Sequence, residues 1–319
     1  MRRILLAALA SLLLYALAFG LVLDRPLSLG FLQQQIEAKL ARGASVPSPK
    51  LVILAGSNAP YSHRCETMEA VLEMPCVNAG VAVGIGLDYL FARWRPLLRA
   101  GDVVYLPMEE AQYVRPNAAT TLGPDAAIML RHDRATLSGL PVERWLGALF
   151  STDLRGAVMS LIETALAARG FRDPRSAATG GTNAQGDHVG HTEALGLASR
   201  GVLAAARPTH VSAEAVRQGD GSALIADFIR HARAAGVQVV GGLPTGFADS
   251  PPPAGTLEAI RAIYVANGAE FLELPNRSRY PRTAFFDTAE HLNEPAQIAH
   301  SQLIAAGLLR GQREGRWGP

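Results

Sequence analysis

Short apolar runs alternate with longer segments of helical periodicity over most of the chain. After residue 50, five runs have the length and composition of buried strands, at 51–55, 76–78, 102–106, 237–242 and 270–274. Apolar residues recur at helical spacing in the segments 65–73, 87–98, 224–234, 256–266 and 295–309. This alternation is typical of a parallel sheet covered by helices.

One long segment, 107–207, interrupts the alternation. It contains a predicted helix at 142–168 and a Gly/Asn/His-rich stretch at 179–191. An insertion at one edge of such a sheet commonly forms a lid or substrate wall. We therefore predict one domain over residues 50–310 and a C-terminal tail at 311–319. Its class is α/β, a flavodoxin-like three-layer α/β/α arrangement with a mainly parallel five-stranded sheet.

The first 25 residues follow a different pattern. Arg2 and Arg3 precede an apolar run at 4–23, which is about the length that a helix needs to cross a bilayer. The two arginines favour a cytoplasmic N-terminus, so we expect a single-pass inner-membrane anchor with the domain in the periplasm. A cleaved signal peptide is the alternative, and it also implies export. A juxtamembrane helix and linker are expected at 26–49.

Composition narrows the possible partners and cofactors. The net charge is only +2, and no basic stripe is interleaved with aromatic residues, which argues against nucleic-acid binding. Cys65 and Cys76 are the only cysteines, and in an oxidising compartment we expect them to form a disulfide, with two free thiols as the alternative. Asp187, His188 and His191 are too sparse a set for a zinc site, so we expect no metal and no cofactor.

Three short segments carry the candidate chemistry, and each lies at an active-site position of an α/β sheet. Ser57 follows the first strand, after a turn that Gly56 permits. Gly80 follows the second strand. Asp287 and His291 precede the last helix, and their spacing of four allows the carboxylate to orient the imidazole ring. A serine hydroxyl needs such a base to become nucleophilic.

The order of these segments resembles the SGNH (GDSL-like) hydrolase superfamily, over about residues 50–310. The resemblance implies that Ser57 is the nucleophile, His291 the general base and Asp287 the residue that orients it. It also implies that the backbone N–H groups of Ser57 and Gly80 stabilise the oxyanion.

Two blocks depart from the usual pattern of that superfamily. The first reads Ala-Gly-Ser-Asn at 55–58 instead of Gly-Asp-Ser. The third reads Leu-Pro-Met-Glu-Glu at 106–110 instead of containing Gly-x-Asn-Asp, so its oxyanion-binding asparagine is missing. Asn183 is a candidate replacement, with a purely structural role in its loop as the alternative. Such blocks, with an anchor and a large insertion, resemble the DltD-like and alginate-acetylation-like branches.

Those branches imply transfer of acyl groups onto an extracytoplasmic glycan, beside a membrane-bound O-acyltransferase. We therefore expect a periplasm-facing O-acyltransferase or esterase that acts through an acyl-enzyme. A carbohydrate esterase or lipase-like hydrolase is one alternative, and a catalytically silent glycan-binding subunit is another. The candidates for contact with substrate are Glu109, Tyr113, Asn183 and His188.

Overall fold

The computed structural model describes residues 1–22, 27–115, 126–149 and 181–316, with a few isolated positions between 158 and 170. Of the helix expected at 142–168, the described part begins as α10 (Val142–Leu149), and most of the remainder lies outside the described residues. The tail expected at 311–319 begins inside the last helix, α18 (Glu294–Arg313).

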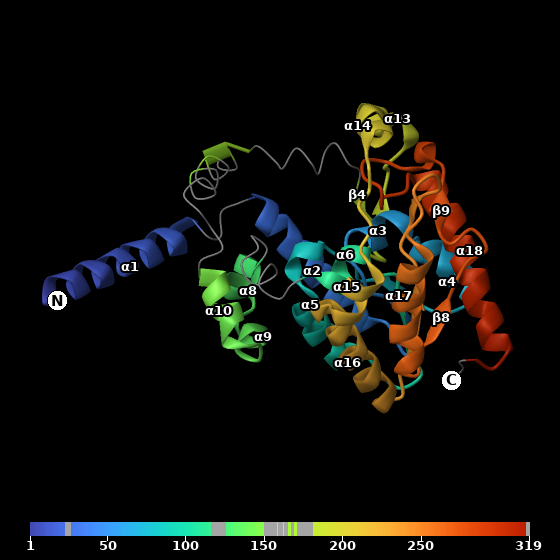
Figure 1. The fold of residues 1–319 in the computed structure, drawn as a ribbon, viewed down its shortest axis with the longest axis horizontal. Coiled ribbons are helices and arrows are strands. Elements are labelled where there is room, and N and C mark those ends of the chain that lie inside the picture. The colour runs from blue at the N-terminus through green and yellow to red at the C-terminus, as the bar shows by residue number, and fades with distance from the viewer. Residues whose placement is uncertain are drawn as a thin grey trace.

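A five-stranded parallel sheet forms the centre of the chain (Figure 1). Its strands are β1 (Leu51–Ile53), β2 (Cys76–Asn78), β3 (Val103–Leu106), β6 (Gln238–Gly242) and β8 (Glu270–Leu272). They lie in the order β2-β1-β3-β6-β8, and every neighbouring pair is parallel. All five predicted strands are therefore confirmed. β1, β2 and β3 are buried at every position, as expected for strands with helices on both faces.

Helices cover both faces of this sheet. The helices around it are α2 (Leu27–Ser45), α3 (Asn58–Ser62), α4 (Cys65–Leu72), α5 (Leu87–Trp94), α16 (Asp220–Ala234), α17 (Ala254–Ala266) and α18. α18 packs against α3 and α4 on one face, whereas α16 packs against α5 and α17 on the other. α2 contacts β2 and buries Ile36 and Leu40 in the core.

The remaining described elements are short. The helices are α6 (Glu110–Val114), α8 (Ala126–His132), α9 (Arg134–Ser138), α13 (Glu193–Gly196), α14 (Arg200–Ala205) and α15 (Ala213–Gln218). The 3₁₀ turns are η1 (Val83–Ile85), η2 (Arg95–Leu97), η3 (Leu197–Ser199) and η4 (Arg282–Ala284). β4 (Gly181–Thr182) pairs with β5 (His188–Val189), and β7 (Gly246–Phe247) pairs with β9 (Arg279–Tyr280). The insertion is thus helical over most of its described part.

The N-terminal segment forms helix α1 (Arg2–Val22), which extends away from the sheet in Figure 1. Within the described residues, no helix combines the length and the apolarity that crossing a bilayer requires. The transmembrane helix expected at residues 1–25 therefore stays a prediction. The Tyr15 hydroxyl donates a hydrogen bond to the carbonyl of Leu149 at 3.1 Å, so α1 contacts the end of α10.

A disulfide joins Cys65, the first residue of α4, to Cys76, the first residue of β2. This confirms the predicted pairing. Both cysteines are fully buried. The bond links α4, the second helix after Ser57, to β2, so it limits movement between these two elements.

Replacing both cysteines with serine should lower the free energy of unfolding by about 2–3 kcal/mol, because the bond closes a short loop in the unfolded chain. Urea denaturation followed by circular dichroism measures the change. A double variant as stable as the oxidised wild type would show that the bond adds no net stability.

Candidate active site

Ser57 lies between the end of β1 and the start of α3. In the strand order β2-β1-β3-β6-β8, the connections from β1 and β3 leave in opposite directions along the sheet. A crevice forms beyond the carboxyl ends of strands at such a switch point, and ligands of α/β proteins bind there. The Ser57 side chain is half-buried at this position.

The structure brings Ser57, His291 and Asp287 into one line of hydrogen bonds. The His291 Nδ1 atom is 2.7 Å from Asp287 Oδ1, and its Nε2 atom is 2.9 Å from the Ser57 hydroxyl oxygen. Because a carboxylate only accepts hydrogen bonds, Nδ1–H is the donor and Nε2 is left to accept the serine proton. This is the tautomer that a general base requires.

Backbone contacts fix His291 beside the serine. The Glu290 carbonyl accepts hydrogen bonds from the hydroxyls of Ser62 and Thr245, at 2.8 and 2.7 Å. Ser62 lies in α3, one turn beyond the nucleophile. The Gln297 side-chain amide, in α18, donates to the Pro60 carbonyl at 2.7 Å. Helix α3 is therefore tied both to the residue that precedes His291 and to α18, which follows it.

A stack of aromatic rings supports the His291 imidazole. The Tyr61 ring lies parallel to it, with centroids 4.1 Å apart and an angle of 6° between the planes. His188 stacks on the same tyrosine, at 4.1 Å and 26°. Sequence reasoning missed Tyr61, although its position four residues after Ser57 on a helical turn was the available signal. His188 therefore lies one ring away from the triad histidine.

Gly56 and Gly80 allow two turns to approach each other closely. A Cβ atom on Gly80 would lie 2.4 Å from the Ala59 Cβ and 2.7 Å from the Gly56 carbonyl oxygen, so only glycine fits. The Gly80 N–H group, expected to bind an oxyanion, faces Asn78 Oδ1 at 3.4 Å. The Gly80 carbonyl accepts from the ammonium group of Lys39 in α2, at 2.7 Å.

Glu109, at the end of β3, reaches the turn that carries Ser57. Its Oε1 accepts the backbone N–H of Asn58 at 3.2 Å, and a Cβ atom on Gly56 would lie 2.5 Å from the same oxygen. Burial raises the pKa of the Glu109 carboxyl to about 7, and the neighbouring Glu290 adds to the rise, whereas His291 and the Asn58 N–H oppose it. Near neutral pH this carboxyl is therefore partly protonated.

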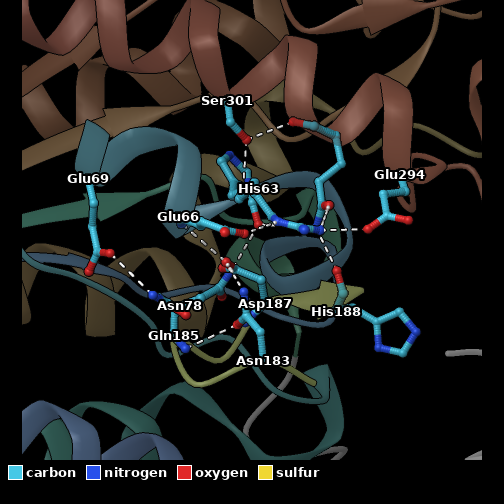
Figure 2. Close-up of polar contacts among 12 residues, drawn as sticks. His63, Glu66, Glu69, Asn78, Asn183, Gln185, Asp187, His188, Glu294 and Ser301 are labelled. Carbon is cyan, nitrogen blue, oxygen red and sulfur yellow. Dashed lines mark hydrogen bonds and ion pairs between the residues drawn. The ribbon is translucent and has the colours of Figure 1, made fainter. Parts of the chain in front are cut away.

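Asn183, a candidate for the missing oxyanion donor with a structural role as the alternative, is held by contacts within its own loop. Its amide nitrogen donates to Asp187 at 3.0 Å, and its Oδ1 accepts the N–H groups of Gln185 and Asp187. Figure 2 shows this loop beside Asn78, whose amide donates to Asp187 Oδ1 at 3.0 Å. These contacts favour the structural role of Asn183 in its loop.

Tyr113, another residue expected to contact substrate, lies inside the core. The side chain is fully buried, and its hydroxyl is 2.9 Å from that of Tyr264. Burial is the main reason why the pKa of Tyr113 lies well above its ordinary value.

Among the described residues, no group of three or more His, Cys, Asp or Glu side chains could hold a metal ion.

The raised pKa of Glu109 predicts a pH-dependent cost to stability. The ordinary pKa is near 4.5, so the stability that the neutral form contributes is complete below pH 4.5 and is lost as the pH rises through about 7. Glu109→Gln should therefore stabilise the chain at pH 8.5 by up to about 3 kcal/mol and have little effect at pH 4.5. Urea denaturation at both pH values measures this, and an equal effect at both would contradict it.

Comparisons with known proteins do not assign this chain to a family. No protein-family model matches the chain, and no curated protein matches it at a significant level. The functional interpretation therefore depends on the residues and distances described above.

Proposed function

We propose that the chain is a serine O-acyltransferase or esterase of the SGNH type, with Ser57, His291 and Asp287 as its triad. The observation that carries the proposal is the continuous line of hydrogen bonds from Asp287 through His291 to the Ser57 hydroxyl. The strand order also agrees with the flavodoxin-like arrangement 2-1-3-4-5, when the sheet strands are numbered along the chain.

The proposed reaction has two steps. In the first, the Ser57 oxygen attacks the carbonyl carbon of an acyl ester, His291 Nε2 takes the serine proton, and the leaving alcohol then receives that proton. The product is an acyl ester on Ser57. In the second, an acceptor hydroxyl or water attacks this ester, its proton passes through His291 to the Ser57 oxygen, and the acyl group leaves the enzyme. Asp287 stabilises the imidazolium in both steps.

The oxyanion of each tetrahedral intermediate develops beside the Ser57 turn, where the Glu109 carboxyl also lies. A charged carboxylate there would oppose the oxyanion, whereas the neutral acid would not. The raised pKa of Glu109 therefore supports catalysis. The Ser57 N–H remains the proposed backbone donor. Because the Gly80 N–H faces Asn78, its use would require a small local shift.

The disulfide supports an extracytoplasmic setting. A buried disulfide is characteristic of oxidising compartments, such as the periplasm. We propose that α1 places the domain at the inner membrane, that the acyl acceptor is a glycan, and that a membrane-bound O-acyltransferase supplies the acyl groups. The alignment of the triad favours this enzyme over a silent glycan-binding subunit.

Turnover of p-nitrophenyl acetate by purified protein tests the proposal. Ser57→Ala should reduce the release of p-nitrophenol by at least about 10³-fold, because the hydroxyl is the attacking group. Asp287→Asn should reduce it strongly as well, since the histidine tautomer is no longer fixed. Ser138→Ala, on an exposed turn of α9, is the matched control and should leave the rate unchanged. A Ser57→Ala protein as active as the wild type would refute the assignment.

A further inference from the structure

A polar cavity borders the triad on the side of Glu109 and Glu290. It has a volume of about 100 Å³ and lies among the start of α6, residues 208–210, β7 and β9. Glu109 contacts the Ser57 turn, and Glu290 directly precedes His291. The triad residues do not line the cavity themselves, but a ligand that extends from it past Glu109 or Glu290 would reach the serine and the histidine.

Arg279, in β9, lines this cavity. Its Nη2 donates to the Pro244 carbonyl at 3.3 Å, but its buried Nε–H has no partner among the described residues. The guanidinium packs closely against Gly246. A Cβ atom added to this glycine would lie only 1.6 Å from Arg279 Nη1. Leaving such a donor unpaired costs about 1–3 kcal/mol, so a bound oxygen atom would be stabilised by it.

Glu110 and His210 form a fixed wall of the cavity. His210 Nδ1 is 2.9 Å from Glu110 Oε1, and His210 Nε2 is 3.1 Å from the Ser250 carbonyl. The other Glu110 oxygen accepts the N–H of Val211 at 3.2 Å. The polar atoms of Glu110 and His210 are therefore bonded mainly to each other and to neighbouring backbone groups. The carboxyl groups of Glu109 and Glu290 also line the cavity and can accept a hydrogen bond from a ligand.

The balance of charge in the cavity selects among ligands. Three carboxyl groups face one guanidinium and one imidazole, and burial raises the pKa of both Glu109 and Glu290. Burial also lowers the pKa of Arg279, while Glu110 and Glu290 act in the opposite direction. The Glu109 and Glu290 carboxyl groups each have another glutamate among the causes of their raised pKa, so negative charge is already disfavoured in the cavity and a further anion would be disfavoured as well. A hydroxyl group, in contrast, can hydrogen-bond to a carboxyl group in either protonation state and accepts from a guanidinium.

We propose that this cavity is the acceptor subsite and that it takes an uncharged, hydroxyl-bearing sugar unit in preference to a uronate or a phosphate-bearing unit. This inference rests on the proposed acyltransferase function. In the transfer step, the sugar hydroxyl forms the new ester bond to the acyl carbon and the bond from that carbon to the Ser57 oxygen breaks. The hydroxyl proton passes through His291 to Ser57.

Transfer from p-nitrophenyl acetate to small sugars tests the preference. Methyl glucoside, glucuronate and glucosamine are offered at equal concentration, and acetylated sugar is measured by mass spectrometry against the p-nitrophenol released. We expect at least tenfold more acetylated methyl glucoside than acetylated glucuronate. Equal acetylation of these two, or a preference for glucosamine, would overturn the proposal.

Two arginine variants test whether the preference for the uncharged sugar arises in this cavity. Arg279→Gln should lower the yield of acetylated methyl glucoside per p-nitrophenol at least fivefold. Arg277→Gln, two residues away, changes an exposed arginine that pairs with Glu273, and it should leave this ratio unchanged. An unchanged ratio in Arg279→Gln would refute the assignment of the cavity.

A binding measurement separates this proposal from the catalytic one. Saturation-transfer NMR should detect methyl glucoside on the Ser57→Ala protein, and adding Arg279→Gln should abolish the signal. If the wild-type protein transfers no acetyl group, but methyl glucoside binds to the Ser57→Ala protein and this binding depends on Arg279, the acyltransferase function would be contradicted and the sugar site would stand. No binding to Ser57→Ala, or binding that is independent of Arg279, would overturn the sugar site.

Discussion

The hydrogen bond between the Ser57 hydroxyl and His291 Nε2 joins residues that are 234 positions apart in the chain. It can form only if α18 packs against the helices that follow β1. Gln297 makes this contact specific, because its buried amide nitrogen lies within hydrogen-bond distance of the carbonyls of Pro60, His63 and His188. Each of these carbonyls lies in a segment that surrounds the triad. The packing of one helix thus sets the position of the proposed catalytic base.

The second constraint is the parallel direction of the sheet. Because all carboxyl ends of its strands lie at one edge, Ser57, Gly80 and Glu109 are brought together although they follow three different strands. A buried ion pair helps to align two of those strands, since the Lys50 ammonium lies 3.2 Å from Asp102 just before β1 and β3. The sheet therefore places chemically different side chains around one crevice.

The sheet and the triad spacing could be predicted from the sequence because both are local signals. Buried strands are short apolar runs, and a separation of four residues places Asp287 beside His291 on one turn. The sequence left two roles open for Asn183, because an amide in a Gly-rich loop can bond within that loop as well as across a crevice. Only the packed structure shows that Asp187 takes its hydrogen bonds. Tyr61 was missed because ring stacking is set by side-chain directions in three dimensions.

The most direct test of the central claim is covalent labelling of the serine. A fluorophosphonate reacts with a serine only when a neighbouring base activates it, so intact-protein mass spectrometry should show one adduct, and peptide mapping should place it on Ser57. His291→Ala should remove the adduct while leaving the fold intact by circular dichroism. The account would be contradicted by no adduct on the wild type, by an adduct on another residue, or by equal labelling of the His291→Ala protein.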